Sequence, residues 1–356
     1  MADLLATGTG PATAGPDTED LWAAVDRLVD STDDLDALYS HRLHLLAARR
    51  WRALGRPVPP ELEEDEREAA LVALLAPELI GRIREAVDGP LLVYKGPEIA
   101  CRYPDPTLRA YIDLDVLVPD AEATQRALVE AGFVEVGDPD YFAASPHSLP
   151  LAWRGFPLLI EVHRQPNWRR WLTPPSNEEL FASAVPSSLG VDGVVTLGPA
   201  EHVLVVAVHT WAHGPLTRLR DLIDVAVLAE GLDPAELDEL ARRWHVERLW
   251  GVTAAATEAV LRGGARPWPL RSWARNLVSV RERTVLESHV GRWLEGFSTL
   301  PPARALARMA AEIRDDLRPR RGETWGDKLR RTGRAMRNAL REKSAHDDEL
   351  VDPDEL

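Results

Sequence analysis

Two aspartates separated by one residue lie in the segment YIDLDVLV, residues 111–118. Its alternating pattern predicts a strand with Asp113 and Asp115 on one face and apolar side chains on the other. Two carboxylates in so small a volume repel each other, and a hard divalent cation with oxygen ligands relieves that repulsion. Glu161, near the end of a second predicted strand over 156–163, adds a third carboxylate if the two strands are neighbours. The spacing predicts a metal site; the alternative is an edge strand whose polar face meets water.

Another predicted strand, 91–95, ends at Lys95 and Gly96. Glycine permits a tight turn and a close approach of the backbone to a ligand, and a helix that begins there offers free N–H groups to a phosphate. Lys95 would add a positive charge to the same anion, or would lie in solvent. Arg109, four residues before Asp113, has two alternative roles, namely contact with a phosphate and pairing with the acidic strand.

The segment LLVYKGPEIACRYPDPTLRAYIDLDVLV, residues 91–118, resembles the signature of the uncharacterised nucleotidyltransferase family, a branch of the polymerase-β-like nucleotidyltransferase superfamily. In that signature a strand, a Lys-Gly turn, a helix, a Tyr-x-x-Pro loop with an Arg and an Asp-x-Asp strand follow in order. The resemblance continues more loosely through SPHSLPLAWRGFPLLIEVHR (145–164) and HTWAHGPLTRLRDLIDVAVL (209–228), and so covers about residues 88–240.

The resemblance implies a metal-dependent enzyme that moves a nucleoside monophosphate from an NTP, ATP by default, to a hydroxyl of a small-molecule or protein acceptor that the sequence does not identify. The implied metal ligands for Mg²⁺ or Mn²⁺ are Asp113, Asp115 and Glu161, with Glu161 also the candidate base; the implied nucleotide-binding residues are Lys95, Gly96 and Arg109. The superfamily normally has Gly-Ser where this chain has Gly96-Pro97. The missing serine favours an alternative, a nucleotide- or partner-binding protein on the same scaffold without turnover.

Four histidines are further candidates for lining the acceptor site or the cleft. His209 and His213 are four residues apart on a predicted helix and share a face, the spacing used by metal-binding helices. They suit a metal phosphohydrolase site, a place in the cleft wall, or hydrogen bonds to backbone and Asp partners. His163, two residues after Glu161, shares its strand face and would orient a carboxylate or the acceptor, and His147 would do the same from the preceding hairpin.

The elements around these residues predict an α+β fold, which the resemblance makes a polymerase-β-like core of a small mixed sheet with helices. Helical periods before the core and after it predict an N-terminal helical segment and a C-terminal helical bundle. The predicted units are a disordered arm (1–17), the N-terminal helical segment (18–88), the nucleotidyltransferase core (89–198), the C-terminal helical domain (199–343) and an acidic disordered tail (344–356).

Composition limits the class of protein. The chain has 356 residues, 45% of them hydrophobic, and a formal net charge of −15, which argues against a general nucleic-acid binder. Its single cysteine, Cys101, excludes an internal disulfide and metal sites built on cysteine clusters. No apolar run predicts a membrane span and no segment reads as a signal peptide, so a cytoplasmic protein without membrane attachment is expected. Nothing in the sequence indicates an oligomeric state.

Overall fold

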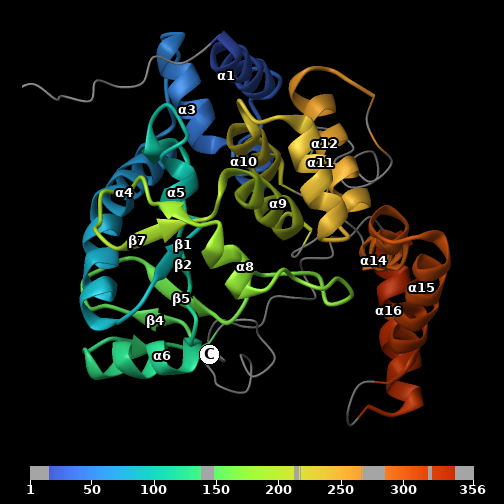
Figure 1. Ribbon diagram of the computed structural model, residues 1–356. Coiled ribbons are helices and arrows are strands. Elements are labelled where there is room, and N and C mark those ends of the chain that lie inside the picture. Colours follow the sequence, from blue (N-terminus) through green and yellow to red (C-terminus); the bar gives the residue numbers. More distant parts are fainter. Residues whose placement is uncertain are drawn as a thin grey trace, which may run out of the picture.

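The computed structural model describes residues 16–137, 148–211, 216, 218–265, 267, 285–319 and 323–340. The strands form a seven-stranded mixed sheet with helices on both faces (Figure 1). The strands follow the spatial order β3 (Val134–Glu135), β4 (Leu151–Ala152), β5 (Leu159–His163), β2 (Asp113–Leu117), β1 (Leu91–Val93), β7 (Val194–Thr196) and β6 (Val185–Pro186). This mixed α and β architecture, with helical segments before and after the sheet, is the one that the sequence predicts.

The N-terminal segment forms four helices, α1 (Pro16–Val29), α2 (Leu35–Ser40), α3 (His44–Ala53) and α4 (Pro60–Ala86). The long helix α4 begins at the last proline of the proline-rich stretch 57–60. Pro60 occupies its first turn, where no intrahelical N–H bond is lost, and Glu61 and Glu63 complement the positive end of its dipole. Residues 1–15 and 341–356, which contain most of the predicted arm and the whole predicted tail, lie outside the described residues.

The sheet separates two hydrophobic cores because its side chains alternate between the faces. Leu114 and Val116 of β2 pack with α4 and α6 (Ala121–Glu130) in one core. Leu117 of β2 and Leu92 of β1 belong to the other core, which contains helices of the C-terminal segment. Asp113 and Asp115 are on the latter face of β2, as the alternation predicts. The carboxylates therefore point toward the helical segment and away from α4.

Neighbouring strands β2 and β5 run parallel, and Asp115 is the register partner of Glu161. The condition for three carboxylates to converge, namely that the two strands are neighbours, is thus met. Three short helices lie between the strands in the chain: α5 (Pro97–Ala100), the 3-10 helix η1 (Pro106–Leu108) and α8 (Asn177–Ala182). The sequence reading missed β6 and β7; β7 has three residues and pairs in parallel with β1.

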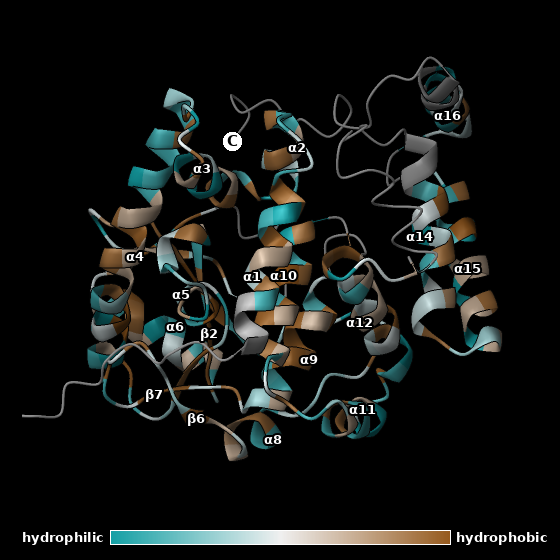
Figure 2. Cartoon of the chain, turned by 90° about the horizontal axis from the view of Figure 1, so that it is seen from above, coloured by the Kyte–Doolittle hydropathy of each residue, from teal (hydrophilic) through white to brown (hydrophobic). Residues whose placement is uncertain are grey.

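The C-terminal segment is helical, as predicted. Its elements are α9 (Pro199–His209), α10 (Leu219–Ala229), α11 (Pro234–Arg243), α12 (Glu247–Leu261), α14 (Val285–Thr299), α15 (Pro302–Leu317) and α16 (Trp325–Leu340). Helices α9 and α10 are strongly hydrophobic and lie near the middle of the molecule (Figure 2). Over the described ranges, no helix combines the length and the apolar character that a membrane crossing requires.

Candidate active site

A cavity of about 270 Å³ lies between the carboxylate-bearing face of the sheet and the helices α9 and α10. The sheet side of its wall contains the three predicted carboxylates, Asp113, Asp115 and Glu161, together with Lys95. Gly96, Arg109 and His209 also line it. One cavity therefore gathers the predicted carboxylates and nucleotide-binding residues with a histidine from the helical segment, whereas His163 is not among its lining residues.

Asp115 is the buried centre of this group, with 1% of its side chain exposed. Its Oδ1 atom contacts both Lys95 Nζ, at 2.7 Å, and His163 Nε2, at 2.8 Å. Its Oδ2 atom is buried and has no hydrogen-bond partner in the part of the chain that the structure describes. Burial alone would raise the pKa of Asp115, but the charge of Lys95 and the hydrogen bond from His163 hold it well below its usual range. Asp115 is therefore an ionised carboxylate with one buried oxygen that no described residue satisfies.

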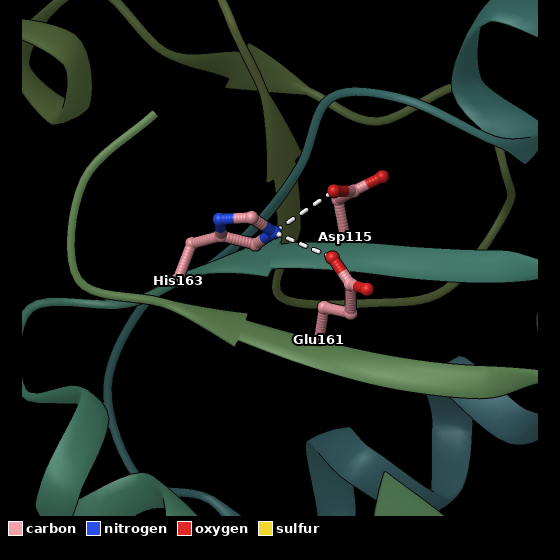
Figure 3. A group of neighbouring side chains, drawn as sticks. All are labelled: Asp115, Glu161 and His163. Carbon is pink, nitrogen blue, oxygen red and sulfur yellow. Dashed lines mark hydrogen bonds and ion pairs between the residues drawn. The ribbon is translucent and has the colours of Figure 1, made fainter. Parts of the chain in front are cut away.

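His163 joins the two strands of the site (Figure 3). Its Nε2 atom lies 3.4 Å from Glu161 Oε2 as well as 2.8 Å from Asp115 Oδ1. A nitrogen that approaches two carboxylate oxygens carries the proton and donates it to them. Burial opposes a charged imidazole, yet these hydrogen bonds raise the pKa of His163. The imidazole thus contacts both carboxylates, and its role in orienting a carboxylate stays a prediction.

The closest set of metal-ligating atoms is not the predicted one. Ligand atoms of Asp115, Glu161 and His163 lie within 4.8 Å of one another. Asp113 lies on the same strand face and lines the same cavity, but it is outside that set. Burial and the neighbouring charge of Asp115 raise the pKa of Asp113. A divalent cation near Asp113 and Asp115 would favour the ionised form of both.

The turn between β1 and α5 brings Lys95 to the carboxylates. Gly96 has a φ of 55°, and a Cβ atom on it would lie 3.2 Å from the carbonyl oxygen of Asp113 and 3.3 Å from the ring of Tyr111. The close packing of the turn against β2 thus requires glycine. The side chain of Lys95 is only 12% exposed, so it does not extend into solvent. Its ammonium group forms an ion pair with Asp115, so its charge is already partly compensated before an anion binds.

Arg109 is buried and engaged by a partner from the helical segment. Its guanidinium forms two hydrogen bonds of 2.8 Å with the carboxylate of Asp224 on α10, and a third of 3.2 Å with the carbonyl oxygen of Gly96. The sequence offered a phosphate or the acidic strand as its partner, and Asp224 is neither. Arg109 remains part of the cavity wall.

Three further arginines in the wall were missed by the sequence reading: Arg42, from the turn between α2 and α3, and Arg218 and Arg220, at the start of α10. Arg42 has no periodic or motif context that would have marked it. Arg218 and Arg220 did carry a signal, because basic residues at the start of an apolar helix oppose the helix dipole. Two arginines at this position do not stabilise the helix, so their presence indicates a different role, such as binding an anion.

The histidines divide into described and undescribed positions. His209 lines the cavity from the end of α9 and so occupies the cleft wall, one of its predicted places. His147 and His213 lie outside the described residues. Asp224 on α10, which lines the same cavity, accepts hydrogen bonds from Arg109 and from the hydroxyl of Tyr103 at 2.7 Å. Over the described ranges, no metal-ligating cluster includes His209.

Comparison with known proteins agrees with the resemblance found in the sequence. A family model described as "Uncharacterised nucleotidyltransferase" matches residues 29–262, from the end of α1 to the end of α12, and leaves out α14, α15 and α16. Searches of curated proteins and of solved structures found no match. The matched range includes the sheet, the cavity and every residue placed in its wall. The chain therefore belongs to the uncharacterised nucleotidyltransferase family and is an enzyme of the nucleotidyltransferase class.

Proposed function

We propose that this enzyme transfers a nucleoside monophosphate from a nucleoside triphosphate to a hydroxyl group of a small-molecule or protein acceptor, with a divalent metal ion, Mg²⁺ or Mn²⁺, as cofactor. One observation carries the proposal. Asp115 and Glu161 are register partners on adjacent strands, and a buried oxygen of Asp115 has no hydrogen-bond partner among the described residues. An ionised carboxylate with a buried, unpaired oxygen is costly unless a cation completes it.

The donor set fits a hard divalent cation, because it consists of carboxylate oxygens on adjacent strands. Asp115 and Glu161 would hold the ion, with Asp113 beside them. When bound, such an ion supplies Lewis-acid stabilisation of phosphate charge and lowers the pKa of a coordinated hydroxyl. His163 donates its Nε2 proton to both ligands and so fixes their orientation.

The remaining roles follow from exposure and charge. Glu161 is 22% exposed, against 1% for Asp115, so an acceptor hydroxyl can reach it as a proton acceptor. The acceptor oxygen forms its bond to the α-phosphorus, the hydroxyl proton passes to Glu161, and pyrophosphate leaves with the electrons of the broken P–O bond. Lys95 contributes fixed positive charge beside the carboxylates, and such preorganised charge stabilises phosphates in a buried site.

The proposal is tested by metal and nucleotide binding. Full-length protein is titrated with Mn²⁺, and then with α,β-methylene-ATP, which binds but resists transfer, with and without Mg²⁺. The Asp115→Asn variant is compared with Asp88→Asn, which changes an exposed carboxylate away from the cavity. We expect Mn²⁺ binding and metal-dependent nucleotide binding in the wild type and in Asp88→Asn, and neither in Asp115→Asn.

Turnover separates the enzyme from a binding protein on the same scaffold. Wild-type protein is incubated with Mg²⁺, α-labelled NTPs and fractionated small-molecule and protein acceptors, and label transfer and pyrophosphate release are followed together. Equal transfer by the wild type and Asp115→Asn, or transfer that persists in excess chelator, would overturn the metal-dependent mechanism. Nucleotide binding without label transfer to any fraction would favour the non-catalytic alternative.

A further inference from the structure

The helical wall of the cavity carries more positive charge than its neighbours compensate. Lys95 is paired with Asp115, and Arg109 with Asp224. Arg42 and Arg218 also line the cavity, yet neither has an ion pair or side-chain hydrogen bond to any residue in the described part of the chain. Asp221 and Asp224, which line the same side, compensate only part of this charge. Among the described residues the cavity wall is therefore polarised, with three carboxylates at the sheet and an excess of guanidinium groups at the helices.

Backbone contacts explain how arginines so distant in sequence meet. The N–H group of Arg220 donates to the carbonyl oxygen of His41 at 3.2 Å, so the start of α10 is tied to the turn that carries Arg42. Arg220 Nη1 donates to the carbonyl oxygen of Ala110 at 2.7 Å, just before β2. The arginine cluster, defined as Arg42, Arg218 and Arg220, is thus fastened to the same segment that positions the metal-binding carboxylates.

Within the cluster, the Nε–H group of Arg220 is a buried hydrogen-bond donor that no described residue accepts from. The side chain of Arg220 is 7% exposed. The nearest carboxylate oxygen, Asp221 Oδ1, is 3.8 Å from Arg220 Nη2, beyond hydrogen-bond distance. A buried donor with no acceptor costs free energy, which a bound anion would recover.

The arginines also oppose one another. Burial, followed by the charges of Arg220 and Arg218, lowers the pKa of Arg42 to about 10. Arg42 in addition holds a φ of 55°, in the left-handed region that non-glycine residues rarely adopt. Three clustered cations and a strained backbone do not stabilise the free protein, and they are the arrangement that an oxyanion of high charge would stabilise.

From these observations we infer that the arginine cluster is the receptor for the β- and γ-phosphates of the nucleoside triphosphate donor. The inference rests on the proposed function for the identity of the donor. The α-phosphate lies toward the carboxylates, the terminal phosphates lie on the arginines, and the leaving pyrophosphate departs on guanidinium groups that neutralise its charge. The cluster takes the place of the phosphate-binding serine that this chain lacks after Gly96.

The test uses inorganic anions, so it does not depend on transfer. Pyrophosphate, tripolyphosphate, AMP, ADP and ATP are titrated into full-length protein in the presence of chelator and then of Mg²⁺. The variants are Arg42→Gln/Arg218→Gln, the charge-conserving Arg42→Lys/Arg218→Lys, and Arg126→Gln, which removes an exposed arginine on α6 as a control. Mn²⁺ binding is measured for each variant, because it reports on the carboxylates alone.

We expect tripolyphosphate to bind the wild type without metal, and the glutamine double variant to bind tripolyphosphate and ATP at least tenfold more weakly. AMP affinity and Mn²⁺ affinity should change less than threefold, the lysine variant should lie between the two, and Arg126→Gln should match the wild type. Unchanged tripolyphosphate and ATP affinity in both double variants would overturn the inference. If Asp115→Asn loses Mn²⁺ binding but still binds tripolyphosphate, the result supports both the metal site and the phosphate receptor. If the wild type binds tripolyphosphate but no Mn²⁺, the result contradicts the metal site and leaves the phosphate receptor supported.

Discussion

Arg109 and Asp224 form a buried, two-pronged ion pair that joins the sheet layer to the helical segment. Both hydrogen bonds are 2.8 Å long, from Nε to Oδ1 and from Nη2 to Oδ2, and each side chain is less than a tenth exposed. Burial alone would raise the pKa of Asp224, but the charge of Arg109 lowers it below the usual value. The pair holds α10, and the arginines at its start, against the turn that contains Gly96.

Removal of one partner of this pair should be strongly destabilising, because it leaves an uncompensated buried charge. We expect Asp224→Asn to lower the free energy of unfolding by about 3–5 kcal/mol, measured by urea denaturation. The exposed pair Arg82–Glu78, 2.8 Å apart, supplies the control. Glu78→Gln should cost less than about 1 kcal/mol because solvent screens that pair. A cost for Asp224→Asn no larger than that of Glu78→Gln would contradict the assigned role.

A second prediction concerns His163, which we expect to act by positioning Asp115 and Glu161. The His163→Phe variant should bind Mn²⁺ about 10–100-fold more weakly than the wild type, the usual effect of losing a partner of a metal ligand. His163→Gln keeps an N–H donor and should recover part of the affinity. Calorimetric Mn²⁺ titration measures both variants, and circular dichroism checks that they are folded. Equal affinities in His163→Phe and the wild type would contradict a positioning role.

Much of the sheet side of the site could be predicted from the sequence, because local pattern determines it. The alternation over 111–118 placed Asp113 and Asp115 on one face, and β2 and β5 lie within the predicted strands. Their side-by-side arrangement was a condition that the pattern could not supply, since pairing between strands is a long-range property. The parallel pairing of β2 and β5 fulfils it.

The helical side of the site could not be predicted in the same way. Arg42 and Arg220 are brought together by a backbone hydrogen bond between residues far apart in the chain, and no local period encodes that contact. The partner of Arg109 could not be predicted either, because it comes from a distant segment of the chain. Its type and distance from Asp113 suggested a phosphate or the acidic strand, whereas the buried carboxylate of Asp224, supplied by another segment, captures it.

The strained backbone of Arg42 gives a prediction that separates function from stability. Glycine adopts a φ of 55° without steric cost, while its greater freedom in the unfolded chain offsets part of that gain. We expect Arg42→Gly to leave the free energy of unfolding unchanged or to raise it by up to about 1 kcal/mol. The same variant should bind tripolyphosphate more weakly. Thermal unfolding and anion titration on one preparation measure both effects, and a clear loss of stability would show that Arg42 serves the fold.

The C-terminal helices are attached to the rest of the chain through a buried acid. Glu295 on α14 is 1% exposed and lies 2.5 Å from Arg169, which precedes α8. Arg308 on α15 stacks on Trp171, with its guanidinium carbon 4.4 Å from the ring centroid. Burial raises the pKa of Glu295 to about 7, although the charges of Arg169 and Arg308 oppose the shift. The folded protein thus binds a proton here that the unfolded chain has already released.

This shift fixes the sign of a pH effect. An acid whose pKa is higher in the folded state stabilises the fold fully below its unfolded pKa, near 4.5, and that contribution is lost as the pH rises through about 7. Between pH 5 and pH 7.5 the wild type should therefore lose about 1–3 kcal/mol of unfolding free energy relative to Glu295→Gln, which has no proton to release. Urea denaturation of both proteins across this range measures the difference, and Glu236→Gln, at an exposed position on α11, should follow the wild type. Parallel stability curves for the wild type and Glu295→Gln would show that Glu295 does not titrate in this range.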